Sequence, residues 1–440
     1  MMKEHNPHQI RNIYIHKCIS KYIPTCQKHI NNINKLKKTQ TGNNKTMKNN
    51  DLSLKTENES FLHNKYMMTN KPSTLQYSAS TYLEKAEPHL SKNLISSKNF
   101  SNINQISQIF PSHLTSFLGF ECHLGDTKPR ADLAFAISGI GSDRQVFTQL
   151  LSNGNFPEFL LKTPEWQRIS NFAKKWSDNT SDLSDKIQCL WLEFDIPDEQ
   201  NPIPIPSIFF GPSKQYCYPK ENDISHIKKL TEEAIFLLKG QKVSATIKQK
   251  INDCLKNMPQ NTSLFQIGTM ISREKQLIRF HINKIKTEQI IPYLKQIGYN
   301  EKTQELEKVL NEIKDKADRF VLSYDITENG IGSRIGIELS YHSNLYQNEN
   351  RWEDLLEYLV SKGICLEEKR EALLNYTGAE YHQDFSGAIL KPVKTSADYI
   401  HNINKSTTVR YINHVKIAYT PNQKLEAKAY PAVRLFENKQ

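Results

Sequence analysis

Charged and hydrogen-bonding side chains recur at every second position in several short runs of the chain. Glu121 and His123 stand two apart in GFECHL, and Lys428 and Tyr430 stand two apart in KAYPAV. Residues at this spacing lie on the same face of a β-strand. A cation on such a face can bind an anionic group, and a carboxylate beside it can accept a proton. These runs therefore indicate a site built from several strands.

Five pairs of strand-like runs would position these side chains. The pairs cover 118–138, 190–210, 264–282, 320–341 and 414–433. Each run is rich in β-branched and aromatic residues and is interrupted by Asp, Pro, Gly, Asn or Lys where a turn belongs. Five pairs are enough to close a barrel. The predicted fold class is α+β, a ten-stranded antiparallel β-barrel of five αββα units with an outer ring of helices.

Amphipathic helices are predicted over 226–240, 301–320 and 351–363, because each of these spacers carries one apolar stripe among charged residues. Gly240 and Gly363 supply good C-terminal stops. Each apolar stripe must be covered, and the apolar faces of the strands can cover it.

Strand parity predicts which side chains line the lumen of the barrel. In RIGIELSY, the apolar Ile335 and Ile337 alternate with the polar Arg334 and Glu338. The apolar face packs on the helices, so the polar face points into the lumen, where ten antiparallel strands leave room for a ligand. The same parity gives a set of further inward residues: Glu121, His123, Asp132, Trp191, Glu193, Asp195, Gln266, Met270, His281, Asn283, Ser323, Asp325, His414, Glu426 and Tyr430.

Five cations are predicted to reach the lumen, namely Arg130, Arg279, Arg334, Lys416 and Lys428. Cations gathered in a confined, weakly polar space are unfavourable unless an anion or paired carboxylates neutralise them. A bound diphosphate meets that requirement. Pairing of each cation with a neighbouring carboxylate or with water at a strand end meets it too.

With this strand order and these runs, the chain resembles the ABBA-type soluble aromatic prenyltransferases, whose PT barrel is made of consecutive α-β-β-α units. The resemblance covers residues from about 75 to 440, with local support from GFECHL and KAYPAV. It implies transfer of an isoprenoid from its diphosphate to an aromatic small molecule or a peptide side chain. It also implies that Glu121 is the catalytic carboxylate that holds the acceptor or takes its proton, and that Lys428 and Tyr430 bind diphosphate.

The resemblance extends to a wider set of substrate-binding residues: Arg130, Trp191, Arg279, His281, Arg334, Lys416, Lys428 and Tyr430. Among these, Trp191 and Tyr430 would face the allylic cation, each ring contributing about 0.5 to 2 kcal/mol. Tyr324 lies on the apolar parity and is expected to be a helix-facing core residue.

Two of the family's runs are altered in this chain. Arg279 and His281 form an R-x-H version of K-x-Y, and Arg334, Gly336 and Glu338 stand where the family has R-x-K-x-Y. One cation and one tyrosine are therefore missing. This departure leaves open a changed substrate or a lost activity, so the sequence does not decide whether the chain is an enzyme.

A non-catalytic barrel that binds a small molecule or a peptide is the alternative, because a fold alone does not establish chemistry. The sequence has no HExxH motif and no zinc-type Cys/His spacing. No protein-ligated metal and no required cofactor are therefore predicted, and a need for Mg²⁺ stays open.

Residues 1–74 are expected to be a disordered basic extension, and residues 75–440 a single domain. Residues 1–60 hold 11 Lys and Arg against 4 Asp and Glu, a net charge of +7 within the chain's +11. Such a segment buries little apolar surface, and a solvated tail is favoured over one that binds nucleic acid. The segment has no membrane-spanning apolar run, and the seven cysteines form no CxxC pair. These features predict a cytoplasmic protein without a membrane partner.

Overall fold

The structure is a computed structural model of the 440-residue chain. It describes residues 78–115, 117–139, 142–152, 154–197, 203–218, 224–271, 277–342, 349–382 and 405–438. The chain divides into two units, Met1–Gln76 and Tyr77–Gln440. The predicted extension over residues 1–74 lies outside the described residues, so its disorder stays a prediction.

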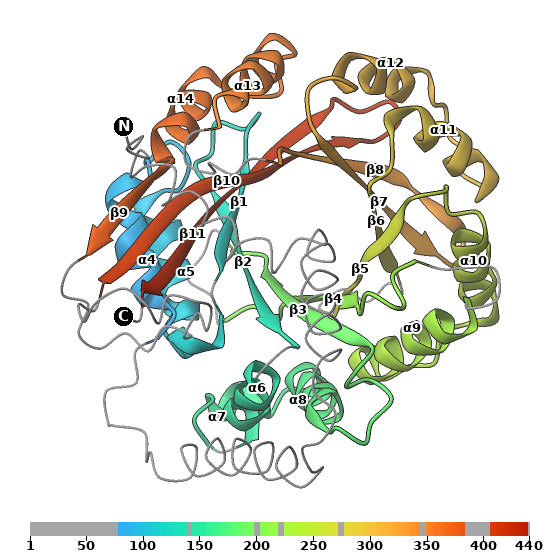
Figure 1. The fold of residues 1–440 in the computed structure, drawn as a ribbon, viewed down its shortest axis with the longest axis horizontal. Helices are drawn as coiled ribbons and strands as arrows, with labels where there is room; N and C mark the ends of the chain where they lie inside the picture. Colours follow the sequence, from blue (N-terminus) through green and yellow to red (C-terminus); the bar gives the residue numbers. More distant parts are fainter. Residues whose placement is uncertain are drawn as a thin grey trace, which may run out of the picture. The chain divides into compact units, whose positions relative to one another are not determined.

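Ten antiparallel strands close into a barrel within the second unit (Figure 1). The strands are β1 (Leu118–His123), β2 (Ala131–Ser138), β3 (Ile187–Phe194), β4 (Ser207–Pro212), β5 (Ser263–Met270), β6 (Ile278–Asn283), β7 (Arg319–Thr327), β8 (Gly330–Ser340), β10 (Lys405–Tyr419) and β11 (Glu426–Asn438). Hydrogen bonding follows chain order from β1 to β8, continues through β10 to β11, and returns to β1. The predicted ten-stranded antiparallel barrel of five adjacent pairs is therefore confirmed.

One further strand, β9 (Gly378–His382), was not predicted. It pairs only with the first part of β10, from Ser406 to Arg410, whereas β8 pairs with β10 from Val415 to Tyr419. An irregularity in the pairing of β10 with β11 falls between Ile412 and Val415. β8 and β9 thus follow one another along the same edge of β10.

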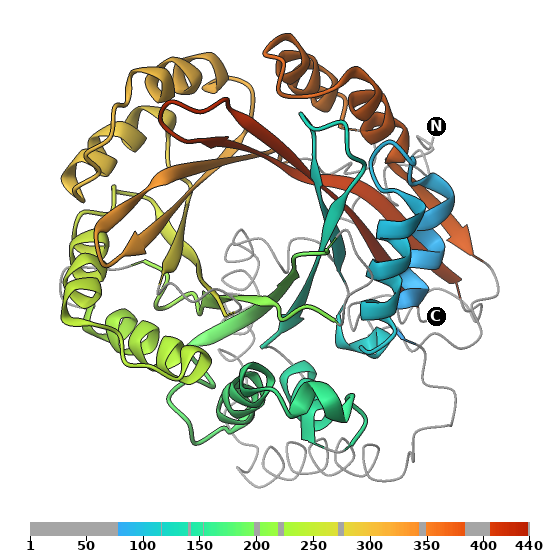
Figure 2. The same ribbon diagram turned by 180° about the vertical axis from the view of Figure 1, so that it is seen from behind.

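Helices lie around the outside of the barrel (Figures 1 and 2). They are α4 (Ser80–Ala86), α5 (Ser97–Ser107), α6 (Asp143–Ser152), α7 (Glu158–Leu161), α8 (Pro164–Ser177), α9 (Ile224–Lys239), α10 (Ala245–Lys256), α11 (Thr287–Gln296), α12 (Gln304–Ile313), α13 (Arg351–Ser361) and α14 (Glu367–Tyr376), with short 3₁₀ turns at Glu87–His89 and Ser112–Leu114. The predicted glycine stops are present, since Gly240 and Gly363 follow α9 and α13 with φ of 72° and 64°.

The helix predicted over 301–320 is shorter in the structure. α12 ends at Ile313, and β7 already begins at Arg319. The residues between them, KDKAD, offer only Ala317 to an apolar stripe. Without apolar contacts to extend it, the helix stops and the alternating run from Phe320 forms a strand.

The outward faces of the strands form the core with the helices. Phe280, Tyr324 and Ile335 are register neighbours across β6, β7 and β8, and each is at most 1% exposed. The Tyr324 hydroxyl lies 2.6 Å from that of Tyr293 on α11. Tyr324 is therefore a helix-facing core residue, as its parity predicted, and it does not face the lumen.

Candidate active site

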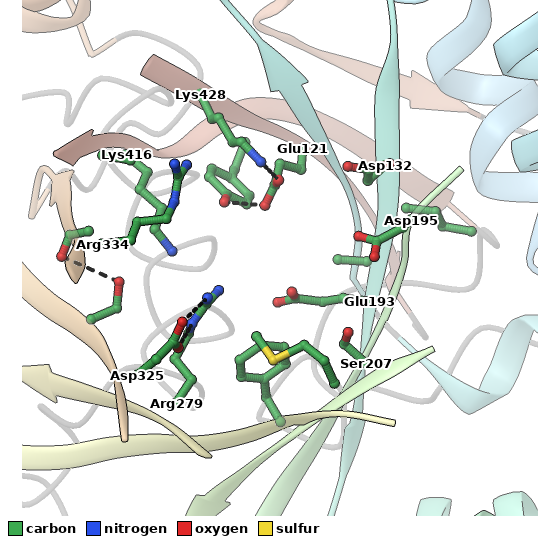
Figure 3. A pocket seen from close by; sticks show the side chains of 18 residues that line it. Glu121, Asp132, Glu193, Asp195, Ser207, Arg279, Asp325, Arg334, Lys416 and Lys428 are labelled. Atoms are coloured by element: carbon green, nitrogen blue, oxygen red, sulfur yellow. Dashed lines mark hydrogen bonds and ion pairs between the residues drawn. The ribbon is translucent and has the colours of Figure 1, made fainter. Parts of the chain in front are cut away.

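The barrel encloses a polar cavity of about 310 Å³ to which all ten barrel strands or the residues directly after them contribute (Figure 3). This volume lies at the small end of the range for ligand pockets. Asp132, Glu193 and Asp195 lie on one side of the cavity, opposite Arg334 and Lys416. One wall of the cavity is therefore rich in carboxyl groups, and basic side chains lie on the wall opposite.

Four of the five predicted cations line this cavity: Arg279, Arg334, Lys416 and Lys428. Each of them already has a carboxylate partner. Arg279 makes two hydrogen bonds to Asp325, of 2.7 and 3.0 Å, and Arg334 makes two to Glu426, also of 2.7 and 3.0 Å. Lys428 pairs with Glu121, and the Lys416 Nζ lies 3.7 Å from the Glu338 Oε1. Internal ion pairs, one of the two arrangements that the sequence left open, thus neutralise the cations.

Arg130 was predicted to reach the lumen, but it does not line the cavity. Its guanidinium lies 3.5 Å from Asp126, within the turn between β1 and β2. β2 begins only at Ala131, so the strand parity that places Asp132 in the lumen does not extend to Arg130.

Glu121 is held by the two residues that the resemblance assigns to diphosphate. Its two carboxylate oxygens accept separate hydrogen bonds, one from Lys428 and one from Tyr430. Burial alone would raise the pKa of Glu121, but the charges of Lys428 and Lys416 and these two hydrogen bonds outweigh it and hold the pKa well below its usual range. Glu121 is therefore a stable carboxylate and a weak base.

In the altered run Arg334, Gly336 and Glu338 of β8, the space beside Gly336 is taken by a side chain of the neighbouring strand β10. A Cβ atom on Gly336 would lie 2.6 Å from the Lys416 Cε and 2.3 Å from the Ser323 Oγ. Lys416 of β10 thus fills the space that a side chain at position 336 would need.

A second cavity of about 100 Å³ adjoins the first, since both are lined by Glu121, Glu193, Arg279, Lys416 and Tyr430. Its walls are more aromatic than those of the first cavity and include Phe117, Trp191, Phe209 and Phe265. The rings of Phe117 and Trp191 meet edge to face at 5.1 Å, and those of His414 and Tyr430 stack at 3.9 Å. This part of the lumen suits a planar aromatic ligand.

Phe209 lines both cavities, although sequence reasoning did not select it. It lies in the continuous apolar run SIFFGP, where alternation does not mark an inward side chain. The one available signal is Gly268, its register partner on β5, where a Cβ atom would come within 2.1 Å of the Phe209 ring. The glycine leaves room for the ring inside the barrel.

His281 lines the second cavity and lies away from the first. Its Nε2 is 3.5 Å from Glu338, which also lies 4.0 Å from His414. Burial, with the charges of Lys416 and Arg279, lowers the pKa of His281 to about 3, so the ring is neutral near pH 7. A neutral imidazole facing a carboxylate is a weak diphosphate ligand, so the R-x-H run is not a simple replacement for K-x-Y.

Two lumen carboxyl groups have raised pKa values. Burial and the charge of Glu121 raise the pKa of Asp132 to about 7 and that of Glu193 to about 8. Asp132 accepts a hydrogen bond from the Ile196 amide, at 2.8 Å. Titration of these two groups is therefore expected close to physiological pH, unlike that of Glu121.

One group of described residues has the spacing of metal ligands. Atoms of Glu121, His123 and Asp132 that could bind a metal lie within 4.8 Å of one another. The trio could hold a divalent cation, but both oxygens of Glu121 are already hydrogen-bonded. The need for Mg²⁺ stays open, as it did from the sequence.

The fold is the PT barrel that the resemblance implied, and solved structures of prenyltransferases are similar to it. The apo form of prenyltransferase PriB is 7% identical, with 80% of this chain and 93% of that one covered and a TM-score of 0.45. For 5-dimethylallyltryptophan synthase from Streptomyces coelicolor the values are 10%, 81%, 97% and 0.44, and for AnaPT from Neosartorya fischeri 12%, 71%, 76% and 0.42.

No protein-family model matches the chain, and no curated protein matches it in sequence. At the identities and TM-scores above, the likeness to prenyltransferases does not indicate the roles of residues. Fold is established here by strand order and register, and function is inferred from the lumen. None of the helices among the described residues is both long and apolar enough to span a membrane.

Proposed function

We propose that the lumen binds a prenyl diphosphate and that the protein transfers the isoprenoid to an aromatic acceptor, either a small molecule or a peptide side chain. The observation that supports this most directly is that four cations, on β6, β8, β10 and β11, line one cavity. A diphosphate carries enough charge to interact with several of them at once. Its departure from an allylic carbon would be favoured by cations already fixed in place.

Binding of the diphosphate would exchange partners within the lumen. Lys428 would leave or share Glu121, and Arg334 would leave or share Glu426. Each exchange replaces one charged hydrogen bond by another, so the site needs no unpaired cation when it is empty. This accounts for a cation-rich lumen in the absence of a ligand.

The aromatic residues next to the cations would stabilise the allylic cation. Tyr430 and Phe209 line both cavities, and Trp191 lines the second. An aromatic face within about 6 Å of a cation contributes on the order of 0.5 to 2 kcal/mol. The prenyl group would therefore lie between the cations of the first cavity and the rings of the second.

The acceptor must lose a proton when its ring regains aromaticity. Two carboxyl groups line both cavities and could receive this proton, Glu121 and Glu193. The resemblance assigns the role to Glu121.

We place this activity in the cytoplasm. The five described cysteines, Cys122, Cys189, Cys217, Cys254 and Cys365, are free thiols. Unpaired cysteines are typical of reducing compartments.

Calorimetric titration with dimethylallyl, geranyl and farnesyl diphosphates tests the proposal. We expect one molecule to bind to the wild type, and Lys428→Ala to weaken binding by on the order of 1.5 to 3 kcal/mol through loss of one charged contact. Lys162→Ala is the matched control, because Lys162 is a 73% exposed lysine on the helix layer. Absence of binding to the wild type at millimolar concentration would refute the proposal.

A non-catalytic binding barrel is the second candidate function, and one observation favours it. Each of the four cations that line the first cavity has a carboxylate partner, so these cations need no diphosphate to neutralise them. The two functions differ in turnover. A binding barrel would hold the prenyl diphosphate intact, whereas a transferase would release inorganic diphosphate.

A further inference from the structure

The two carboxyl groups that line both cavities differ in their partners. Glu121 is engaged through both oxygens by Lys428 and Tyr430. For Glu193, none of the described residues provides a hydrogen bond or an ion pair within 4.0 Å. Each Glu121 oxygen thus already accepts one hydrogen bond, whereas the acceptor sites of both Glu193 oxygens are available to an incoming acceptor.

The strand register explains why Glu193 extends freely into the lumen. It pairs with Ala134 on β2 and with Ser207 on β4, so both flanking side chains are small. Its neighbours in sequence, Leu192 and Phe194, are buried on the helix side. Figure 3 shows the Glu193 carboxyl group pointing from β3 into the cavity.

Glu193 also lies where the first cavity, which holds the cations, meets the more aromatic second cavity. The groups that act on it electrostatically include Glu121 on β1, Arg279 on β6, Glu338 on β8 and Lys416 on β10. Asp132 on β2 and Asp195 after β3 share its wall of the first cavity, and β4 contributes Ser207 and Phe209, which carry no charge. A group here can contact a ring in the aromatic cavity while the diphosphate occupies the cationic one.

We propose that Glu193, rather than Glu121, is the carboxyl group that binds the N–H or O–H donor of the acceptor and takes up the proton it loses. This inference rests on the proposed function. The bond from the prenyl C1 to the diphosphate oxygen breaks, and the oxygen keeps the electron pair. A new bond forms from C1 to a ring carbon of the acceptor. The C–H bond at that carbon then breaks, its electron pair restores the aromatic ring, and the proton passes to an oxygen of the Glu193 carboxylate.

The acid strength of Glu193 suits this role. Burial and the charge of Glu121 raise its pKa to about 8, which makes its carboxylate a stronger base than that of Glu121. A general base is most effective when its pKa lies near the working pH. Glu121 instead positions Lys428 and Tyr430 through its two hydrogen bonds.

Matched probes with and without a donor hydrogen test the assignment. Indole and 1-methylindole, and phenol and anisole, are titrated into the wild type, Glu193→Ala and Glu121→Ala at about pH 9, where the Glu193 carboxyl is ionised. The wild type should bind the donor-bearing probe of at least one pair about tenfold or more tightly than its methylated partner. Glu193→Ala should abolish this preference, and Glu121→Ala should keep it.

A preference that is lost only in Glu121→Ala, or kept in both variants, would overturn the inference. If no probe binds although dimethylallyl diphosphate does, the inference also fails while the diphosphate site stands. If dimethylallyl diphosphate does not bind either, the proposed function fails with it.

The isosteric Glu193→Gln variant gives a second readout should Glu193→Ala fail to fold. In the wild type, prenyl transfer should rise with pH to a plateau above about pH 8. Glu193→Gln should be slower and should lose this rise, while it still binds dimethylallyl diphosphate. An unchanged pH profile in Glu193→Gln would exclude Glu193 as the proton acceptor.

Discussion

The two faces of the barrel strands differ in composition and role, although alternate residues of the same runs form them. The outward face is apolar and closely packed, as in the row of Phe280, Tyr324 and Ile335 against the helices. The inward face carries charges, as in Arg279 and Asp325, which pair with each other and are the sequence neighbours of Phe280 and Tyr324. Stability is therefore expected to reside mainly in the outward face, and ligand binding in the inward one.

The largest expected effect on stability comes from replacing a phenylalanine by alanine on each of the two faces. Phe280→Ala on the outward face should destabilise the protein by about 3 to 5 kcal/mol, because a closely packed core relaxes little around the cavity. Phe209→Ala in the lumen should cost less, because its ring already borders two cavities that water can enter. Urea unfolding of both variants measures this difference, and equal losses would show that the lumen is as closely packed as the core.

The next effect concerns the internal ion pairs. Arg279→Ala should lower the free energy of unfolding by about 3 kcal/mol, because it leaves the Asp325 carboxylate without its two hydrogen bonds. Adding Asp325→Ala should restore part of the loss, since no unpaired charge is left. A double-mutant cycle by urea unfolding measures the coupling, and additive losses would mean that the two residues do not stabilise each other.

A smaller effect depends on pH and involves the unpaired Glu193. Its pKa is about 8 in the folded protein against an ordinary value of 4.5, so the folded state binds more protons between these values. Stability from this group is complete below about pH 4.5 and is lost as pH rises toward 8. Glu193→Gln removes this loss. Its unfolding free energy should exceed that of the wild type by more at pH 9 than at pH 5.

Thermal unfolding of both proteins at the two pH values measures that difference. Asp132, whose pKa is raised in the same direction, is present in both and sets a common background. The same difference at pH 5 and pH 9 would mean that Glu193 titrates normally.

The smallest effect is expected on the outside of the helices. The Lys162 Nζ lies 2.9 Å from Glu158, but both side chains are more than 70% exposed. Lys162→Ala should change the free energy of unfolding by less than about 0.5 kcal/mol, because solvent screens such a pair. A loss above 1 kcal/mol in urea unfolding would show that the surface contributes more than this comparison of faces allows.

The sequence was sufficient to predict the layers of the molecule. Alternation in runs such as RIGIELSY marks the inward and outward faces, because side-chain direction along a strand has a period of two. That rule correctly placed Glu121, Arg334 and Lys428 in one lumen. It was wrong for Arg130, which precedes the first residue of β2.

The partners within the lumen could not be predicted. Lys428 meets Glu121 only because β11 returns to pair with β1, which brings together residues 307 positions apart in the chain. Lys416 replaces a missing side chain only because Gly336 lies beside it on β8. Such contacts depend on register and rotamer, which hydrophobic periodicity does not specify.

Release of inorganic diphosphate from dimethylallyl diphosphate is the measurement that tests the central claim most directly. If the lumen ionises the donor, the wild type should release diphosphate faster than buffer, because water can capture the allylic cation even without the natural acceptor. An indole or phenol acceptor should increase the rate, and Lys428→Ala should lower it. Binding of dimethylallyl diphosphate without any release above the buffer rate would contradict the transferase and leave a binding barrel.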